Sequence, residues 1–163
     1  MTTTETTESP FNKARRKLVA ARIEFIGQLA KFSTDELALR PIEGEWSPLQ
    51  LAHHVYIAEG MVLEQLKLVQ NEENPLVANV AEQAPRITET SEPPVSLEAV
   101  LSGMAARREE VFEYLAALPE DAWMRPFRRP EGEDRKFYQM VNILALHDQL
   151  HAQQLAKIKA ALS

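Results

Sequence analysis

The sequence predicts an all-α chain that folds as a four-helix bundle, and two observations support this prediction. Apolar residues recur at steps of three and four along four long segments, which is the period of a helix that buries one face. The 163 residues include only 5 glycines, and no stretch shows the sustained polar and apolar alternation that is typical of a strand. Four such helices, each roughly twenty residues long, can bury their apolar stripes together in a bundle.

The first helix is expected from Pro10 to about residue 31, because proline suits the first position of a helix. Residues 1–9, mostly Thr and Glu, are expected to form a disordered tail before it. The rest of the chain, 10–163, then forms a single domain, since this length suits one core rather than two. The apolar stripe of this helix consists of Phe11, Leu18, Ala21, Phe25 and Leu29.

The start of the second helix is marked by three residues. Ser47 can cap the helix, Pro48 suits its first position, and Gln50 stands where a capping box takes Glu or Gln. The helix should run to about residue 70, with His54 on its core side and His53 about 100° away by helical geometry. His54 is therefore the better candidate for a buried site.

A long connection is expected between the second and third helices, because residues 71–95 contain four prolines. It is long enough for these two helices to lie parallel. The third helix opens at Ser96 and is stopped by Pro119, and a second loop, 119–136, leads into the last helix, 137–162. In the last helix, His147 and His151 occupy positions of the apolar stripe that aliphatic residues would otherwise fill.

Composition argues against several functional classes. The chain has no cysteine, so a disulfide, a cysteine nucleophile and a thiolate ligand are all excluded. Its net charge is -6, with 18 Lys and Arg against 24 Asp and Glu, which argues against nucleic-acid binding because phosphate contacts need a basic surface. No apolar run has the length of a membrane span, and the N-terminus lacks the pattern of a signal peptide. We therefore expect a cytoplasmic protein whose partners are small molecules or proteins.

Three histidines form a candidate metal site. Residues four apart on a helix share one face, so His147 and His151 can bind one ion, and His54 from a facing helix can complete a three-nitrogen set with water in the fourth position. The alternative is that these are ordinary structural histidines, since the His-x3-His pair alone is a loose motif. Buried imidazoles without partners would each cost about 1 to 3 kcal/mol, however, and a shared metal removes that cost.

Two other kinds of metal site fit the sequence less well. A di-iron carboxylate bundle needs Glu-x-x-His on two helices, yet neither His54 nor His147 has an acid three residues before it. The zincin motif H-E-x-x-H is approached by His147-Asp-Gln-Leu-His151, but Asp148 is one methylene shorter than the usual base and no further histidine follows. A protease is therefore not supported.

Two motifs together resemble a known family. The stretch Arg40-Pro-Ile-Glu-Gly-Glu-Trp-Ser-Pro-Leu-Gln-Leu-Ala-His-His54, followed by His147-x3-His151-x2-Gln154, resembles the DinB/YfiT-like superfamily over most of the chain. The resemblance implies a four-helix bundle, often dimeric, with a divalent metal, typically nickel or zinc, on one histidine of the second helix and the His-x3-His pair of the fourth. The family pattern places its first histidine eight residues after the tryptophan, which selects His54 and gives His53 no role.

The resemblance implies a broad range of reactions. Some relatives are thiol-dependent transferases or isomerases that use mycothiol, bacillithiol or glutathione, and an open metal site also suits hydrolysis. We therefore expect a divalent-metal-dependent enzyme with zinc or nickel, either a hydrolase or a low-molecular-weight-thiol-dependent transferase, in a homodimer. Its substrate would be a small molecule, and any thiol would come from outside the chain. The alternative is a noncatalytic dimeric bundle, with a structural metal or metal-free histidines, that acts as a binding protein.

Three further residues are candidates for the surroundings of the site. Glu59 and Gln154 lie about one turn from the proposed ligands and could accept the second N–H of an imidazole, although a plain interhelical role is equally open. Trp46 is expected to pack against the end of the bundle or to line the pocket. No general base is evident. The loop before the last helix is basic and could receive an anionic substrate through Arg125, Arg128, Arg129, Arg135 and Lys136.

Overall fold

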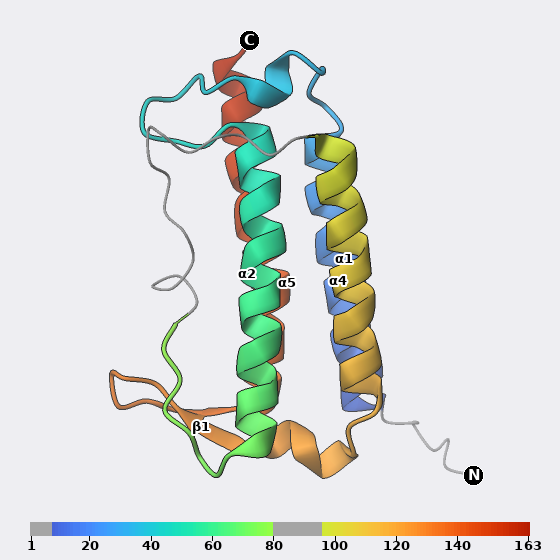
Figure 1. The fold of residues 1–163 in the computed structure, drawn as a ribbon, viewed down its shortest axis with the longest axis vertical. Helices are drawn as coiled ribbons and strands as arrows, with labels where there is room; N and C mark the ends of the chain where they lie inside the picture. Colours follow the sequence, from blue (N-terminus) through green and yellow to red (C-terminus); the bar gives the residue numbers. More distant parts are fainter. Residues whose placement is uncertain (1–7, 80–95) are drawn as a thin grey trace, which may run out of the picture.

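The chain folds as a bundle of four long helices, which a computed structural model describes for residues 8–79 and 96–163 (Figure 1). The four helices are α1 (Pro10–Leu29), α2 (Pro48–Asn71), α4 (Leu97–Ala116) and α5 (Phe137–Ala161). Two short 3-10 helices lie in the connections, η1 (Glu36–Ala38) and η2 (Glu120–Met124). The predicted four-helix bundle is therefore confirmed. Most of the expected tail and of the connection 71–95 falls on residues 1–7 and 80–95, outside the described residues.

The helices pack so that α5 contacts both α1 and α2, while α4 packs against α2. Figure 1 shows that α2 and α4 run in the same direction, and α1 and α5 in the opposite one. A parallel pair needs a connection that can span the length of the bundle, and the 25 residues between α2 and α4 are enough for that. Among the described residues, no helix is both long enough and apolar enough to cross a membrane.

The predicted helix starts are confirmed by their caps. The Ser9 and Ser96 hydroxyls each accept a backbone N–H from the first turn of α1 and α4. At α2 the capping box is complete, because Gln50 N–H donates to Ser47 Oγ at 3.1 Å and Ser47 N–H donates to Gln50 Oε1 at 2.9 Å. This cap fixes the first turn of α2 just before His54. The helix ends lie within two residues of the predicted positions.

The apolar core is divided into two clusters along the bundle. The lower cluster, at the end where α2 finishes, contains Leu18, Leu66, Val111, Phe137 and Leu144 among others. The upper cluster, at the end where α2 begins, includes Phe25, Val55, Met104 and Leu155. Each helix therefore contributes to both clusters, and the break between them occurs at one level of the bundle.

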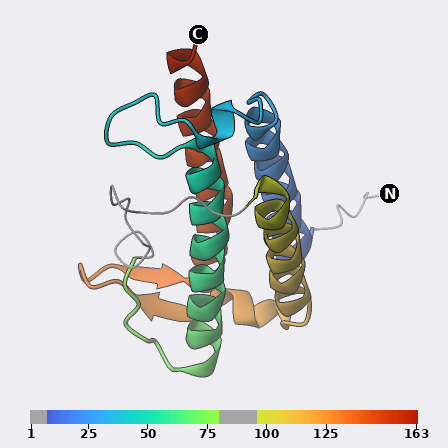
Figure 2. The ribbon, with the colours of Figure 1, turned by 45° about the horizontal axis from the view of Figure 1, so that its top comes forward.

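The loop 119–136 contains structure that the sequence did not indicate. After η2, strands β1 (Pro126–Arg128) and β2 (Asp134–Lys136) form an antiparallel hairpin that pairs Phe127 with Arg135. Figures 1 and 2 place it at the end of the bundle where α2 stops and α5 starts. Each strand has only three residues, which is too short for an alternating pattern to be recognised. The buried Phe127 ring anchors the hairpin in the lower cluster.

The arginines of this loop bind the end of α2. Arg125 donates to the carbonyls of Val69 and Glu72, and Arg128 donates to the carbonyl of Asn74. Cationic side chains are favoured there because the last turn of a helix presents unpaired carbonyls. Arg125 and Arg128 therefore hold the hairpin against the bundle, and binding of an anionic substrate by this loop stays a prediction.

We expect the capping box of α2 to contribute measurably to stability. The substitution Ser47→Ala should lower the free energy of unfolding by about 1 kcal/mol, because the Gln50 N–H loses its acceptor in a buried position. Urea denaturation followed by circular dichroism measures this change. Ser102→Ala, at an exposed position inside α4, is the matched control and should be neutral or slightly stabilising. Equal effects of the two substitutions would contradict the role given to the cap.

Candidate metal centre

Three of the four histidines converge between α2 and α5. His54, in the second turn of α2, and His147 and His151, one turn apart in the middle of α5, each offer a ring nitrogen within 4.8 Å of the other two. The Nε2 atoms of His147 and His151 are 2.9 Å apart. The ring centroid of His54 lies 5.3 Å from that of His147 and 5.0 Å from that of His151. The fourth histidine, His53, instead stacks on Tyr56.

The spacing of these nitrogens is compatible with one shared metal ion. Two ligands that each lie about 2.1 Å from an ion and 2.9 Å from each other subtend an angle of about 90° at the ion, which coordination geometry allows. Two ligands of one ion can be at most about 4.2 Å apart, somewhat less than the 4.8 Å limit of the group. A pair of ring nitrogens near that limit would therefore have to approach each other when an ion binds.

Burial keeps the histidines neutral. Desolvation, with smaller contributions from His151 and His53, lowers the pKa of His54 to about 4. Desolvation likewise lowers the pKa of His147 to about 3, helped by the neighbouring histidines and by Arg22. The pKa of His151 is also lowered by burial, against the opposing effects of its hydrogen bond to Gln154 and of the nearby Asp148. All three imidazoles are therefore neutral at neutral pH, which is the form that binds a metal.

Gln154 and Glu45 fix the orientation of His151. Gln154 Nε2 donates to Glu45 Oε2 at 3.0 Å, because a carboxylate can only accept. The other amide atom, Oε1, then faces His151 Nδ1 at 2.8 Å, so this ring nitrogen must carry the proton. His151 Nε2 is consequently an acceptor and receives the Nε2 proton of His147 in the metal-free cluster. For both Nε2 atoms to bind one ion, the His147 proton would move to Nδ1. The lone pair of His151 Nε2 thus points into the cluster, as a ligand requires.

His54 is held by stacking rather than by a hydrogen bond. The Trp46 indole lies against its imidazole, with ring centroids 4.4 Å apart and an interplanar angle of 28°. His54 Nδ1 is buried and has no hydrogen-bond partner among the described residues. Such an orphaned nitrogen costs about 1 to 3 kcal/mol, which a bound metal or a bound water could offset. The donor set and this unpaired atom both fit a divalent cation.

The remaining predicted site residue, Glu59, lies in a different environment. Its carboxylate accepts from Arg22 of α1 at 2.7 Å and from Arg108 of α4 at 2.6 Å, so it joins helices instead of orienting an imidazole. Asp148, the residue at the zincin base position, is bound to the same two arginines. Neither carboxylate is free to take a proton from a substrate. The described residues around the histidines thus include no evident general base.

Sequence reasoning missed Arg22 and Arg108, although a signal was present. Arg108 stands four residues after Met104 and three before Val111, on the apolar stripe predicted for the third helix. Arg22 follows the buried Ala21 of the first helix. A charged residue on a core stripe needs a buried partner of opposite sign. Glu59 and Asp148 also fall on buried positions, so four such interruptions indicate a network.

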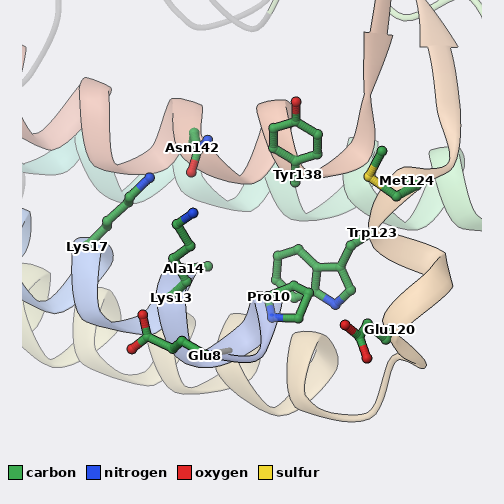
Figure 3. Close-up of a pocket in the computed structure, with 10 residues that line it drawn as sticks. All are labelled: Glu8, Pro10, Lys13, Ala14, Lys17, Glu120, Trp123, Met124, Tyr138 and Asn142. Atoms are coloured by element: carbon green, nitrogen blue, oxygen red, sulfur yellow. The ribbon is translucent and has the colours of Figure 1, made fainter. Parts of the chain in front are cut away.

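Two hollows lie near these elements. One, of about 340 Å³, is lined in part by Glu45 and Gln154, so the pair of residues that orients His151 lies beside a surface hollow. Figure 3 shows the other, of about 360 Å³, between the start of α1, η2 and the start of α5. Trp123 and Pro10 form its apolar side, and Lys13 and Lys17 lie along its rim. No histidine lines it, so it is separate from the candidate metal centre.

The proton positions in the metal-free cluster can be observed directly. Two-bond ¹⁵N–¹H correlation spectra at pH 7 should show His151 protonated on Nδ1 and His147 on Nε2, because Gln154 and Glu45 impose this arrangement. In Gln154→Leu the constraint is removed, and His151 should become a mixture of tautomers. His53, outside the cluster, is the internal reference. A wild-type His151 protonated on Nε2 would overturn this assignment.

Comparison with solved structures supports the fold. The protein resembles YfiT from Bacillus subtilis, described as a probable metal-dependent hydrolase with an unusual four-helix bundle topology, with a TM-score of 0.74, 14% identity and coverage of 99% of this chain and 93% of that chain. It also resembles TT2238, a four-helix bundle protein, with a TM-score of 0.63, 21% identity and coverage of 90% and 98%. A third neighbour is a mycothiol-dependent maleylpyruvate isomerase, with a TM-score of 0.52, 17% identity and coverage of 95% and 63%.

The family assignment comes from sequence. No curated protein matches the chain. At the identities above, the three solved structures establish a shared fold and nothing finer. The sequence pattern of the DinB superfamily, however, matches residues 17–155, which include all of α2 and all three clustered histidines. This chain therefore belongs to the DinB superfamily.

Proposed function

We propose that this protein is a divalent-metal-dependent enzyme, either a hydrolase or a low-molecular-weight-thiol-dependent transferase. His54, His147 and His151 would hold the metal, which we propose to be zinc or nickel. The observation that carries the proposal is the convergence of three neutral imidazoles from two helices within 4.8 Å. Three protein ligands leave a coordination position open, the arrangement of catalytic rather than closed structural sites.

The residues around the cluster support chemistry at an open position. When bound, the metal would supply a Lewis acid that lowers the pKa of water toward about 7 or binds a thiolate. Gln154 and Glu45 hold His151 in the tautomer that directs its lone pair inward. Trp46 covers one face of His54 and excludes water from that side. Gln154 and Trp46 are thus the two predicted surrounding residues that we assign to the site.

The choice between the two reactions rests on relatives of this fold. One solved neighbour is described as a probable metal-dependent hydrolase and another as a mycothiol-dependent isomerase. We propose a small-molecule substrate and, for thiol transfer, an external thiol, because the chain has no cysteine of its own. We also propose that residues 10–163 form one domain, that the protein is a cytoplasmic homodimer, and that it does not bind nucleic acid, as its net charge of -6 suggests.

A noncatalytic binding protein is the second candidate, and one observation favours it. The nitrogens of His147 and His151 already bond to each other, and His151 also bonds to Gln154. These two imidazoles therefore have partners without any metal. In that case the histidines are structural and the bundle would bind a small molecule or a protein.

Metal binding separates these candidates. We expect one zinc or nickel ion per chain in the wild-type protein, and His147→Ala should abolish stoichiometric binding because two nitrogens cannot replace three. Helix content should fall only modestly, since the bundle has its own apolar core. Elemental analysis, titration calorimetry and circular dichroism measure these quantities. His53→Ala is the matched control, one residue from a proposed ligand, and should bind like the wild type. Loss of the fold in His147→Ala would contradict this prediction.

Activity should depend on the metal and identify the reaction. The chelated protein and its zinc- and nickel-loaded forms are assayed against a panel of electrophiles and esters, with and without mycothiol, bacillithiol or glutathione. We expect turnover only in a metal-loaded form, and its dependence on thiol distinguishes transfer from hydrolysis. His54→Ala should lose turnover while His53→Ala retains it. Stoichiometric metal that no chelator removes, without any turnover, would favour the noncatalytic bundle.

A further inference from the structure

A layer of four charged residues, three of them buried and Arg22 partly buried, crosses the bundle at the level of the histidines. Each helix contributes one residue: Arg22 from α1, Glu59 from α2, Arg108 from α4 and Asp148 from α5. The layer contains two cations and two anions, so its formal charges balance. It lies close to the boundary of the two apolar clusters: on α1, α4 and α5 the buried apolar residues before and after it belong to different clusters, and on α2 the change falls between Val55 and Ala58, just before Glu59. We call these four residues the charged layer.

The two arginines join the same two carboxylates. Arg108 reaches Glu59 through Nε and Nη2, at 3.1 and 2.6 Å, and Asp148 through Nη2 at 3.1 Å. Arg22 reaches Asp148 through Nε at 3.0 Å and Glu59 through Nη2 at 2.7 Å. Arg108 Nη1 also donates to the Leu18 carbonyl of α1 at 3.1 Å. The result is a closed ring in which arginines of α1 and α4 tie α2 to α5.

The helices tied together are those that carry the histidines. Asp148 follows His147 directly and precedes His151 by three residues, and Glu59 lies five residues after His54. The distance between the two carboxylates therefore sets how far the α2 backbone stands from the α5 backbone beside the cluster. The Trp46 stack is the other described support of His54. The ring thus joins α2 to α5 close to the positions where His54 and the His147 and His151 pair face each other.

Stability alone does not explain this layer. Buried ion pairs lose hydration that their attraction only partly restores, and apolar residues of similar volume often stabilise a core as well or better. Glu59 and Asp148 are only 3% and 1% exposed, so the desolvation is nearly complete. What ion pairs provide and apolar contacts lack is fixed length and direction. Fixed length and direction are the properties needed to hold two helices at a set distance.

We propose that the charged layer is the positioning device of the metal centre: Arg108 and Arg22 hold Glu59 and Asp148, and so fix the spacing between His54 and the His147 and His151 pair. The inference rests on the proposed function, because the spacing matters for a shared cation. The four residues are positioning residues, since they touch one another and not the proposed ion. Their balanced charge also leaves the histidine cluster without a neighbouring excess of positive charge.

The test uses a substitution that keeps the positive charge at residue 108 and removes the planar guanidinium group. Arg108→Lys retains one positive charge, but a single ammonium cannot bridge Glu59, Asp148 and the Leu18 carbonyl as the planar guanidinium does. Titration with zinc and with cobalt(II), in the full chain, gives the affinity and the visible spectrum of the ligand field. We expect an affinity lower by about ten- to a hundredfold and an altered cobalt spectrum. Wild-type affinity and spectrum in a folded Arg108→Lys would overturn the proposal.

The matched control separates positioning from stability. Leu115→Ala creates a cavity in the same helix, in the lower cluster and away from the histidines. Measured below its melting temperature, it should bind zinc within about twofold of the wild type although it is destabilised. A loss of affinity equal to that of Arg108→Lys would overturn the proposal, because binding would then follow stability alone. If Arg108→Lys does not fold, Arg22→Lys, at the more exposed arginine, replaces it with the same expected results.

A metal-free measurement distinguishes failure of this inference from failure of the proposed function. The chain has no cysteine, so Glu64→Cys in α2 and Gln149→Cys in α5, both exposed, accept spin labels selectively. Electron double resonance should give a narrow distance distribution in the otherwise wild-type chain and in Leu115→Ala, and a broader one in Arg108→Lys. If the wild type binds no zinc or cobalt, the proposed function fails, but broadening in Arg108→Lys still supports a role of the charged layer in fixing the spacing of α2 and α5. Unchanged distance distributions in all three labelled proteins would overturn that role.

Discussion

The charged layer is the constraint on which the rest of the bundle depends. An apolar stripe allows helices to slide and rotate with little change in buried area, because dispersion and the hydrophobic effect are not directional. Four ion-paired residues, one from each helix, satisfy one another at only one combination of heights and rotations. Burial alone would lower the pKa of Arg108, but Glu59 and Asp148 outweigh it and raise that pKa. The arginine therefore stays charged and the ring stays closed.

The candidate metal centre is supported on one side by the charged layer and on the other side by the loop at the end of the bundle. The layer supports the histidines through Glu59 and Asp148, and the loop before α2 supports them through Trp46 and Glu45. That loop is itself fixed by the capping box of Ser47 and Gln50, which starts α2 two residues after Trp46. A cluster supported from both sides can be precise although its own contacts are few. The histidines thus sit between two parts of the chain that are rigid for different reasons.

The sequence predicted local features well and long-range polar contacts poorly. The start of α2, the preference for His54 over His53 and the placement of His147 and His151 on one face follow from helical period and capping, which involve residues a few positions apart. Arg22 and Asp148 are 126 residues apart, and no local pattern pairs them. The three-residue strands of the hairpin were not predicted, because burial of Phe127 holds them and no alternating pattern marks them. Gln154 could be suggested from its spacing to His151, but its bond to Glu45 could not.

The charges around the histidines bear on what the centre would bind. The three clustered imidazoles that we propose as ligands are neutral, and the described cluster includes no carboxylate. The charged layer adds no net charge, and Glu45 is separated from His151 by the Gln154 amide. A divalent ion held there would keep most of its positive charge, and in a buried setting that charge favours an anionic partner strongly. Hydroxide and thiolate are both such partners, which is why hydrolysis and thiol transfer remain compatible with one set of residues and differ only in what reaches the open position.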